Sequence, residues 1–196
     1  MAKINLGING TKKEKIVQQA AALFKAKSYN AASMRELAVA LGVEAPSLYN
    51  HIGAKSELLQ AICFEVGAKF TAQIQLIENS NATAIAKIET IIRFHIQTTL
   101  QHFDEVYVSN HEWKHLPEPF LNDFLNIRRS YEKSLTHLVE TAIAQNEIRK
   151  TNPYVAVLTI LYAVRGLEFW QRYQKNVSPR VLEDDMVNHL IYGLKN

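Results

Sequence analysis

Two histidines and a glutamate near the middle of the chain have the spacing of a zinc site. His111, Glu112 and His115 form the pattern HExxH, in which both histidines bind zinc from one helix face and the glutamate acts as general base. Only three positions of the pattern are fixed, so its specificity is weak. Pro117 and Pro119 follow directly and would end the helix that the pattern needs. We therefore expect no enzymatic activity and no cofactor.

A metal-dependent role for these histidines stays open as an alternative. No third ligand follows at a recognised spacing, and Glu132 lacks a supporting context. A metal-responsive regulator could combine His111 and His115 with His102. A zinc hydrolase is the more remote alternative, because the sequence shows no β-rich catalytic frame. Our prediction is that the chain has no metal site.

A short polar segment, residues 44–51, has the composition of a helix that reads DNA. Leu48 and Ile52 are spaced to face a core. This leaves hydroxyl, amide and imidazole groups on the other side, where they can form hydrogen bonds in the major groove. These exposed candidates are Ser47, Tyr49, Asn50 and His51.

Positive charge is concentrated in the same part of the chain. Residues 1–60 have a net charge of +4, whereas the whole chain has +3, so the remainder is slightly acidic. Lysines stand at expected helix starts, where a cation opposes the helix dipole. These are Lys12, Lys13, Lys15 and Lys55. Their placement is understandable if phosphates lie nearby, and it favours a nucleic-acid partner.

A third group of residues is suited to a hydrophobic ligand. His95 shares an inner helix face with Ile88 and Ile92. Arg128 and Tyr131 lie one helical turn apart. An arginine among aromatic side chains can meet a carboxylate, thioester or phosphate, whereas an ordinary core role is the alternative for each residue. The candidate effector-binding residues are His95, Trp113, Phe124, Arg128, Tyr131, Arg165, Phe169 and Trp170.

Three helices within the first fifty residues would position the DNA-reading segment. Two of them begin with a capping box, in which side chains satisfy the free N–H groups of the first turn. The pairs are Thr11 with Glu14 and Ser33 with Glu36. Gly42 stands where a left-handed cap would end the helix over 34–41, and Pro46 fits the first turn of a helix that runs to about residue 51. Two short helices joined by a glycine turn form a helix-turn-helix pattern.

The rest of the chain is also predicted to be helical. The expected helices span residues 55–78, 82–102, 104–115, 120–145, 153–174 and 179–194. Leu182, Met186 and Leu190 recur every fourth residue, so we expect the last two helices to form a dimer seam. The predicted fold class is all-α. A three-helix DNA-binding domain would occupy residues 1–60, and a helical effector-binding and dimerisation domain residues 61–196.

Composition is that of a folded protein from a reducing compartment. Hydrophobic residues make up 47% of the 196 residues, which allows a sizeable core. Cys63 is the only cysteine, so no internal disulfide can form. The first ten residues lack the apolar stretch of a signal peptide, and the longest apolar run, 154–164, is too short to cross a bilayer. We expect a cytoplasmic protein without a membrane partner.

Residues 12–60 resemble the N-terminal domain of TetR-type transcriptional regulators. The order, spacing and chemistry of the matching residues all agree. They are Ile16, Ala20, Leu23, Phe24, Tyr29, Ser33, Met34, Leu37, Ala38, Leu41, Gly42, Val43, Ser47, Leu48, Tyr49, His51, Lys55, Leu58 and Leu59. The resemblance implies phosphate contacts for Tyr49, His51 and Lys55. The residues that it implies at the groove are Ser33, Ala45, Pro46, Ser47 and Asn50.

Four positions depart from this family's pattern. Ser28 stands where a glycine is usual, and Ala32 where a threonine is common. Ile52 replaces the usual phenylalanine, and Glu44 takes a place often held by serine. Glu44 would either disfavour nearby phosphates or accept from a cytosine amino group, so we assign it no base.

Residues 83–194 resemble the effector and dimerisation domain of the same family, and more narrowly its branch of acyl-CoA-responsive repressors. The matching stretches are 95–108, 112–116, 128–131 and 161–173. The resemblance implies a homodimer on palindromic operator DNA that is released by a small hydrophobic or acyl-CoA-like effector. The effector would have to bind the non-DNA form better. A general architectural DNA binder is the rival, and it would show no sequence preference and a steep salt dependence.

Overall fold

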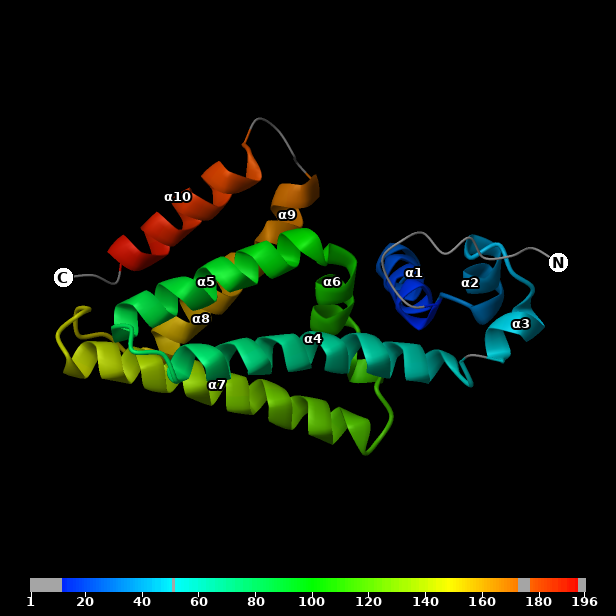
Figure 1. Cartoon of the computed structure of the whole chain (residues 1–196), viewed down its shortest axis with the longest axis horizontal. Coiled ribbons are helices and arrows are strands. Elements are labelled where there is room, and N and C mark those ends of the chain that lie inside the picture. The colour runs from blue at the N-terminus through cyan, green and yellow to red at the C-terminus, as the bar shows by residue number, and fades with distance from the viewer. Residues whose placement is uncertain (1–11, 51, 173–176, 194–196) are drawn as a thin grey trace. The chain divides into compact units, whose positions relative to one another are not determined.

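Helices and their connections make up the described part of the chain, which comprises residues 12–50, 52–172 and 177–193 of a computed structural model. No β-strand occurs among these residues, which confirms the predicted all-α class. The elements in chain order (Figure 1) are α1 Lys12–Lys27, α2 Met34–Ala40, α3 Ala45–Tyr49, α4 Lys55–Glu78, α5 Ala84–Gln101, α6 Phe103–His111, the 3-10 helix η1 Trp113–His115, α7 Phe120–Ala144, α8 Pro153–Arg165, α9 Leu167–Arg172 and α10 Pro179–Tyr192. None of these helices is long and apolar enough to cross a bilayer.

Local sequence signals set several helix ends as predicted. The capping box of α2 is present: the Ser33 hydroxyl accepts from the N–H of Glu36 at 3.2 Å, and the Glu36 carboxylate accepts from the N–H of Ser33 at 2.9 Å. Asn152 and Ser178 cap α8 and α10 through their side-chain oxygens. Thr11, the predicted cap of α1, lies outside the described residues.

Two predicted helices are interrupted. The helix predicted over 104–115 ends at His111, and the chain then tightens into η1, where i→i+3 hydrogen bonds replace i→i+4 bonds. This turn places Leu116 in the core. The helix predicted over 153–174 is broken at Gly166, whose carbonyl accepts from the N–H of Phe169 three residues on. Glycine is a weak helix former, so the break is cheap at this position.

Three of the described residues have positive φ, namely Ser28, Gly42 and Asn146, and each follows the end of a helix. Gly42 after α2 has φ +67°, which confirms the predicted left-handed cap. Ser28 after α1 has φ +70°. The left-handed conformation at residue 28 favours glycine, which accounts for the glycine that the TetR pattern usually has there. The serine tolerates the same turn at a cost of about 1–2 kcal/mol.

The chain divides into two compact units. The N-terminal unit comprises residues 1–68 and 103–125, and the C-terminal unit residues 69–102 and 126–196. The division falls inside α4, between α5 and α6, and inside α7. The functional division predicted at residue 60 remains a prediction, since it concerns roles rather than packing.

One apolar core holds the N-terminal unit together. Its largest fully buried side chains come from α1 to α4, so the predicted three helices pack on the start of α4. They are Ile16, Phe24, Leu37, Leu48, Leu58, Leu59 and Ile62. Val108, Leu116 and Phe124 complete this core. Lys25 of α1 also pairs with Asp104 of α6 and lies 4.6 Å from the ring centre of Phe103.

The C-terminal unit is built on a second core from α4, α5, α7, α8 and α10. Ile88, Ile92 and Ile96 form its stripe along α5. Leu182, Met186 and Leu190, predicted to face a second copy of the chain, are partly buried and pack against this core of their own chain. The four-residue repeat is thus used, at least in part, for packing of α10 on α5 within the chain, and the dimer seam of the last two helices remains a prediction.

Candidate functional site

The short helix α3 presents polar side chains to solvent over an apolar base. Leu48 and Ile52 are 1% and 4% exposed, as predicted. On the other side, Ser47 and Asn50 are exposed, and Tyr49 is 51% exposed. A fixed helix with exposed hydroxyl and amide groups on its outer face has the form required to enter a major groove.

The other residues predicted at the groove differ in their exposure and in the hydrogen bonds that they already make. Ala45 and Pro46 open α3, with Glu44 as its N-cap, and Pro46 is exposed. Ser33 is exposed, but its N–H and its hydroxyl both donate to Glu36 at 2.9 Å. The hydrogen bonds from Lys27 and Ser33 lower the pKa of Glu36 to about 2, so this carboxylate stays charged. His51 lies outside the described residues.

Lys55, at the first position of α4, turns back onto the loop between α1 and α2. Its ammonium donates to the carbonyl oxygens of Tyr29 at 2.8 Å and Ala32 at 2.9 Å, and to that of Asn30 at 3.5 Å. It also lies 4.4 Å from the centre of the Tyr29 ring. These contacts account for a cation at an unfavourable helix end without any phosphate. Sequence spacing gave no sign of them, since the partners lie 23 to 26 residues away.

The two histidines of the HExxH pattern do not share a helix face, because α6 ends at the first of them. The His111 ring lies 4.4 Å from that of Tyr107, whereas His115 stacks on Tyr29 at 5.4 Å. Glu112 is buried, and its carboxylate lies 3.4 Å from His115. Among the residues that the structure describes, no three histidine, cysteine, aspartate or glutamate side chains come together as metal ligands. The geometry therefore gives no support to a metal-responsive or zinc-hydrolase alternative.

Two of the predicted effector residues meet in the C-terminal unit. His95 of α5 and Tyr131 of α7 share a hydrogen bond of 2.7 Å between the imidazole Nε2 and the hydroxyl oxygen. Phe70 of α4 packs on both rings, at 4.5 Å from His95 and 5.9 Å from Tyr131, and also contacts Phe94. The result is a small polar pair inside an aromatic cluster, the mixture that a hydrophobic ligand site uses.

Both members of this pair are neutral near pH 7. Burial, and then the positive charge of Arg165, lowers the pKa of His95 to about 3. Burial also raises the pKa of Tyr131. The pair can therefore exchange hydrogen bonds with a carbonyl or hydroxyl group without bringing a charge into the core.

The remaining predicted effector residues are divided between the two units. Arg128, Arg165, Phe169 and Trp170 belong to the C-terminal unit, where Arg165 lies 5.3 Å from the ring centre of Tyr162. Phe169 is 64% exposed, so it is not a wall of an enclosed pocket within this chain. Trp113 and Phe124 belong to the N-terminal unit, where Phe124 is 2% exposed and contacts Phe64. Both pack in or against the core of that unit.

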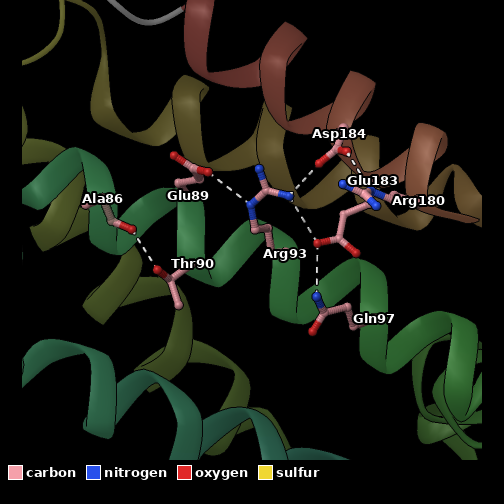
Figure 2. Close-up of polar contacts among 8 residues, drawn as sticks. All are labelled: Ala86, Glu89, Thr90, Arg93, Gln97, Arg180, Glu183 and Asp184. Atoms are coloured by element: carbon pink, nitrogen blue, oxygen red, sulfur yellow. Dashed lines mark hydrogen bonds and ion pairs between the residues drawn. The ribbon is translucent and has the colours of Figure 1, made fainter.

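Sequence reasoning missed the partners of Arg93. This arginine of α5 donates to Glu89 at 3.0 Å, to Glu183 at 3.1 Å and to Asp184 at 3.0 Å (Figure 2). Only the pair with Glu89, four residues away, could have been found from spacing. The contact of Phe70 with His95 was also missed, because nothing local indicates that it packs on a histidine of another helix.

Apolar side chains remain exposed on the last three helices. Those more than 40% exposed are Tyr154, Val155 and Tyr162 of α8, Phe169 of α9, and Val181 and Tyr192 of α10. A gathering of exposed apolar side chains on consecutive helices is typical of a surface that another protein covers.

Two family models together match most of the chain. Residues 16–62 match the family described as "Bacterial regulatory proteins, tetR family". Residues 81–194, more than half of the chain, match the family described as "Tetracyclin repressor-like, C-terminal domain". No curated protein matches the chain in sequence.

Solved structures with the same fold include three regulators. AibR in complex with isovaleryl coenzyme A and operator DNA is 24% identical, with a TM-score of 0.81 over 92% of this chain and 98% of that one. The ketosteroid regulator KstR2 of Mycobacterium tuberculosis is 16% identical, with a TM-score of 0.86 over 99% and 100%. PfmR from Thermus thermophilus is 20% identical, with a TM-score of 0.80 over 93% and 100%.

Proposed function

The chain belongs to the TetR family of bacterial regulatory proteins, and from this premise we propose that it is a homodimeric repressor, released from a palindromic operator by a hydrophobic or acyl-CoA-like effector. The observation that carries the proposal is the outer face of α3. Ser47, Tyr49 and Asn50 are exposed there on a helix fixed by buried Leu48. Such a face suits the reading of base edges, and a regulator needs sequence preference.

Within this function, the DNA contacts divide into two kinds. We assign Ser47 and Asn50 to the groove, with Ser33, Ala45 and Pro46 at its margin. Tyr49 and His51 are assigned to phosphates by the family pattern. Lys55 shares that assignment, although its ammonium already binds the loop carbonyls of Tyr29 and Ala32. Phosphate contacts position the protein, whereas groove contacts select the sequence.

The effector site is placed at the His95–Tyr131 pair and the aromatic rings around it. A neutral donor–acceptor pair next to Phe70 suits a thioester carbonyl at the end of an apolar chain. Arg128 and Arg165 are the cations of the same unit that could meet phosphate or carboxylate groups. AibR has been solved with isovaleryl coenzyme A and operator DNA, which makes short acyl-CoA thioesters the first compounds to test.

A dimer would cover the exposed apolar side chains of α8, α9 and α10. Two-fold symmetry then predicts a palindromic operator, with half-sites roughly 34–36 Å apart or a multiple of this distance. Because the proposed partner is operator DNA, we infer that the protein acts in the cytoplasm. The proposed role is regulatory rather than enzymatic.

Selection from random double-stranded DNA tests this function. The full chain is selected at near-physiological salt, with and without each member of a panel of acyl-CoA thioesters. We expect a palindromic consensus whose binding is lost on adding one thioester. Binding that follows salt concentration alone, with no consensus, would instead support an architectural DNA binder. A consensus that survives every thioester would refute the acyl-CoA effector and leave the regulator intact.

A further inference from the structure

The first half of α10 has less apolar packing than the second half, because Leu182, which is only partly buried, is its apolar contact with the core. Among the residues of α10, all of which are described, Val187 and Ile191 are the buried ones, and both lie in the second half. Between the first half and α5 is a pocket of about 430 Å³. Its lining residues are Gln97, Leu100, Gln101, Pro179, Arg180, Glu183 and Asp184. A hollow of this size removes the dispersion contacts that would otherwise fix a helix on its neighbour.

Charge takes the place of packing in this half of the helix. Arg93 of α5 binds two consecutive residues of α10, Glu183 and Asp184, through one guanidinium nitrogen (Figure 2). The amide of Gln97, one turn along α5, donates to Glu183 at 2.9 Å. The Nε–H of the same guanidinium donates to Glu89 of α5 at 3.0 Å. This bond within α5 fixes the plane of the guanidinium group.

The same half of α10 presents an apolar side chain outward. Val181 is 48% exposed, two residues before Glu183, and is one of the exposed apolar side chains that the proposed dimer would cover. Because Glu183 and Asp184 are consecutive and both bind Arg93, they fix the rotation of α10 about its own axis. That rotation decides whether Val181 points toward a second copy of the chain.

We propose that Arg93 is a positioning residue for dimerisation: its ion pairs with Glu183 and Asp184 hold the first half of α10 in the orientation that a second copy of this chain binds. This inference rests on the dimer in the proposed function. It goes further, because it makes an apolar dimer interface depend on a charge network within each protomer.

The proposal has a consequence that an apolar interface alone would not have. The side chain of Arg93 is 33% exposed and that of Asp184 is 47% exposed, so dissolved salt can screen their attraction. Association through apolar surface is not weakened by salt in this way. The dimer of the wild-type chain is therefore expected to weaken as NaCl rises.

Sedimentation equilibrium of the full chain at about 50 mM and about 500 mM NaCl measures this effect. Arg93→Met keeps the apolar stem and removes the charge. We expect the dimer dissociation constant to rise about tenfold at low salt and to lose its salt dependence. Arg93→Lys, which keeps the charge but not the planar fork, should lie between the two.

Arg180→Met is the matched control. Arg180 lies on α10 itself, but its side chain is 93% exposed and its contact with Asp184 is 3.8 Å long, so no change is expected. Should Arg93→Met fail to fold by circular dichroism, Glu183→Gln and Asp184→Asn combined remove the same ion pairs from the other helix. A folded Arg93 variant with wild-type dimerisation at both salts would overturn the proposal. A wild-type chain that stays monomeric would instead overturn the dimer on which it rests.

Discussion

The imidazole of His95 and the hydroxyl of Tyr131 lie 2.7 Å apart and join α5 to α7 inside an aromatic cluster. Arg93 and Gln97, on either side of His95 in the sequence, point instead to α10. At about 100° per residue, a step of two residues nearly reverses the direction of a helical side chain. One helix therefore carries the candidate effector contact on one side and the contacts to α10 on the other.

The low pKa of His95 predicts that the protein loses stability as pH falls. The unfolded chain takes up this proton near pH 6.5, whereas the folded chain does so only near pH 3. The free energy of unfolding should therefore fall from about pH 6.5 downward, by at most about 1.4 kcal/mol per pH unit. Because His95 keeps some solvent contact, the slope should be smaller than this limit. Urea unfolding between about pH 7.5 and 5.5 measures it, and His95→Gln should have a flatter profile. Identical profiles would contradict the pKa shift.

Tyr131→Phe removes the hydroxyl that His95 contacts and leaves the rings packed. We expect a loss of about 1–2 kcal/mol in the free energy of unfolding, since a buried polar group loses its partner. Release from the operator should need about tenfold more effector, while operator affinity without effector stays unchanged. Fluorescence anisotropy of labelled operator measures both quantities. Tyr107→Phe, at a half-buried tyrosine of α6 in the N-terminal unit, serves as control. An unchanged release curve would return Tyr131 to a plain core role.

Lys55→Met tests whether the lysine acts on DNA or on its own loop. Loss of its contacts to the carbonyls of Tyr29 and Ala32 should lower the free energy of unfolding by about 1–3 kcal/mol. Operator affinity should fall equally for all sequences. The dependence of that affinity on salt separates the two roles. A slope reduced by about one indicates a lost phosphate contact, whereas an unchanged slope indicates that Lys55 only anchors the loop.

Substitutions on α3 should separate sequence choice from affinity. Ser47→Ala and Asn50→Ala are expected to change which bases are preferred, at a cost of about 1–3 kcal/mol on the original operator. Tyr49→Phe should weaken all sequences nearly equally, because a phosphate contact carries no base information. Binding to a library of single-base operator variants gives both readings. A shift in preference caused by Tyr49→Phe would move that residue into the groove.

Ser28→Gly should stabilise the protein. At φ +70°, serine is strained by about 1–2 kcal/mol, and glycine relieves this while costing about 0.5–1 kcal/mol of extra chain entropy. We expect a net gain of about 0.5–1 kcal/mol in denaturant unfolding. Gly42→Ala is the inverse control: its Cβ would meet nothing within 4 Å, so the φ of +67° alone should make it destabilising. A destabilised Ser28→Gly variant would show that the hydroxyl makes a contact worth more than the strain.

Much of the fold could be predicted because its causes are local. The caps at Ser33, Asn152 and Ser178 act within one helical turn, and the positive φ of Gly42 follows from its place after α2. The buried base of α3 followed from the spacing of Leu48 and Ile52. Helix ends inside long helical patterns were harder to predict. One continuous pattern was read across α6 and η1, and another across α8 and α9, so the turn at η1 and the break at Gly166 were missed.

By itself the sequence determined the helices, the helix-turn-helix and the family, because capping, glycine conformation and apolar periodicity act over a few residues. Only the tertiary structure decided what the charged and aromatic side chains contact. Lys55 binds carbonyls more than 20 residues away, Arg93 binds carboxylates of α10 about 90 residues away, and His115 stacks on Tyr29. Such partners are set by which helix faces meet, and this depends on the packing of the whole core rather than on any local spacing.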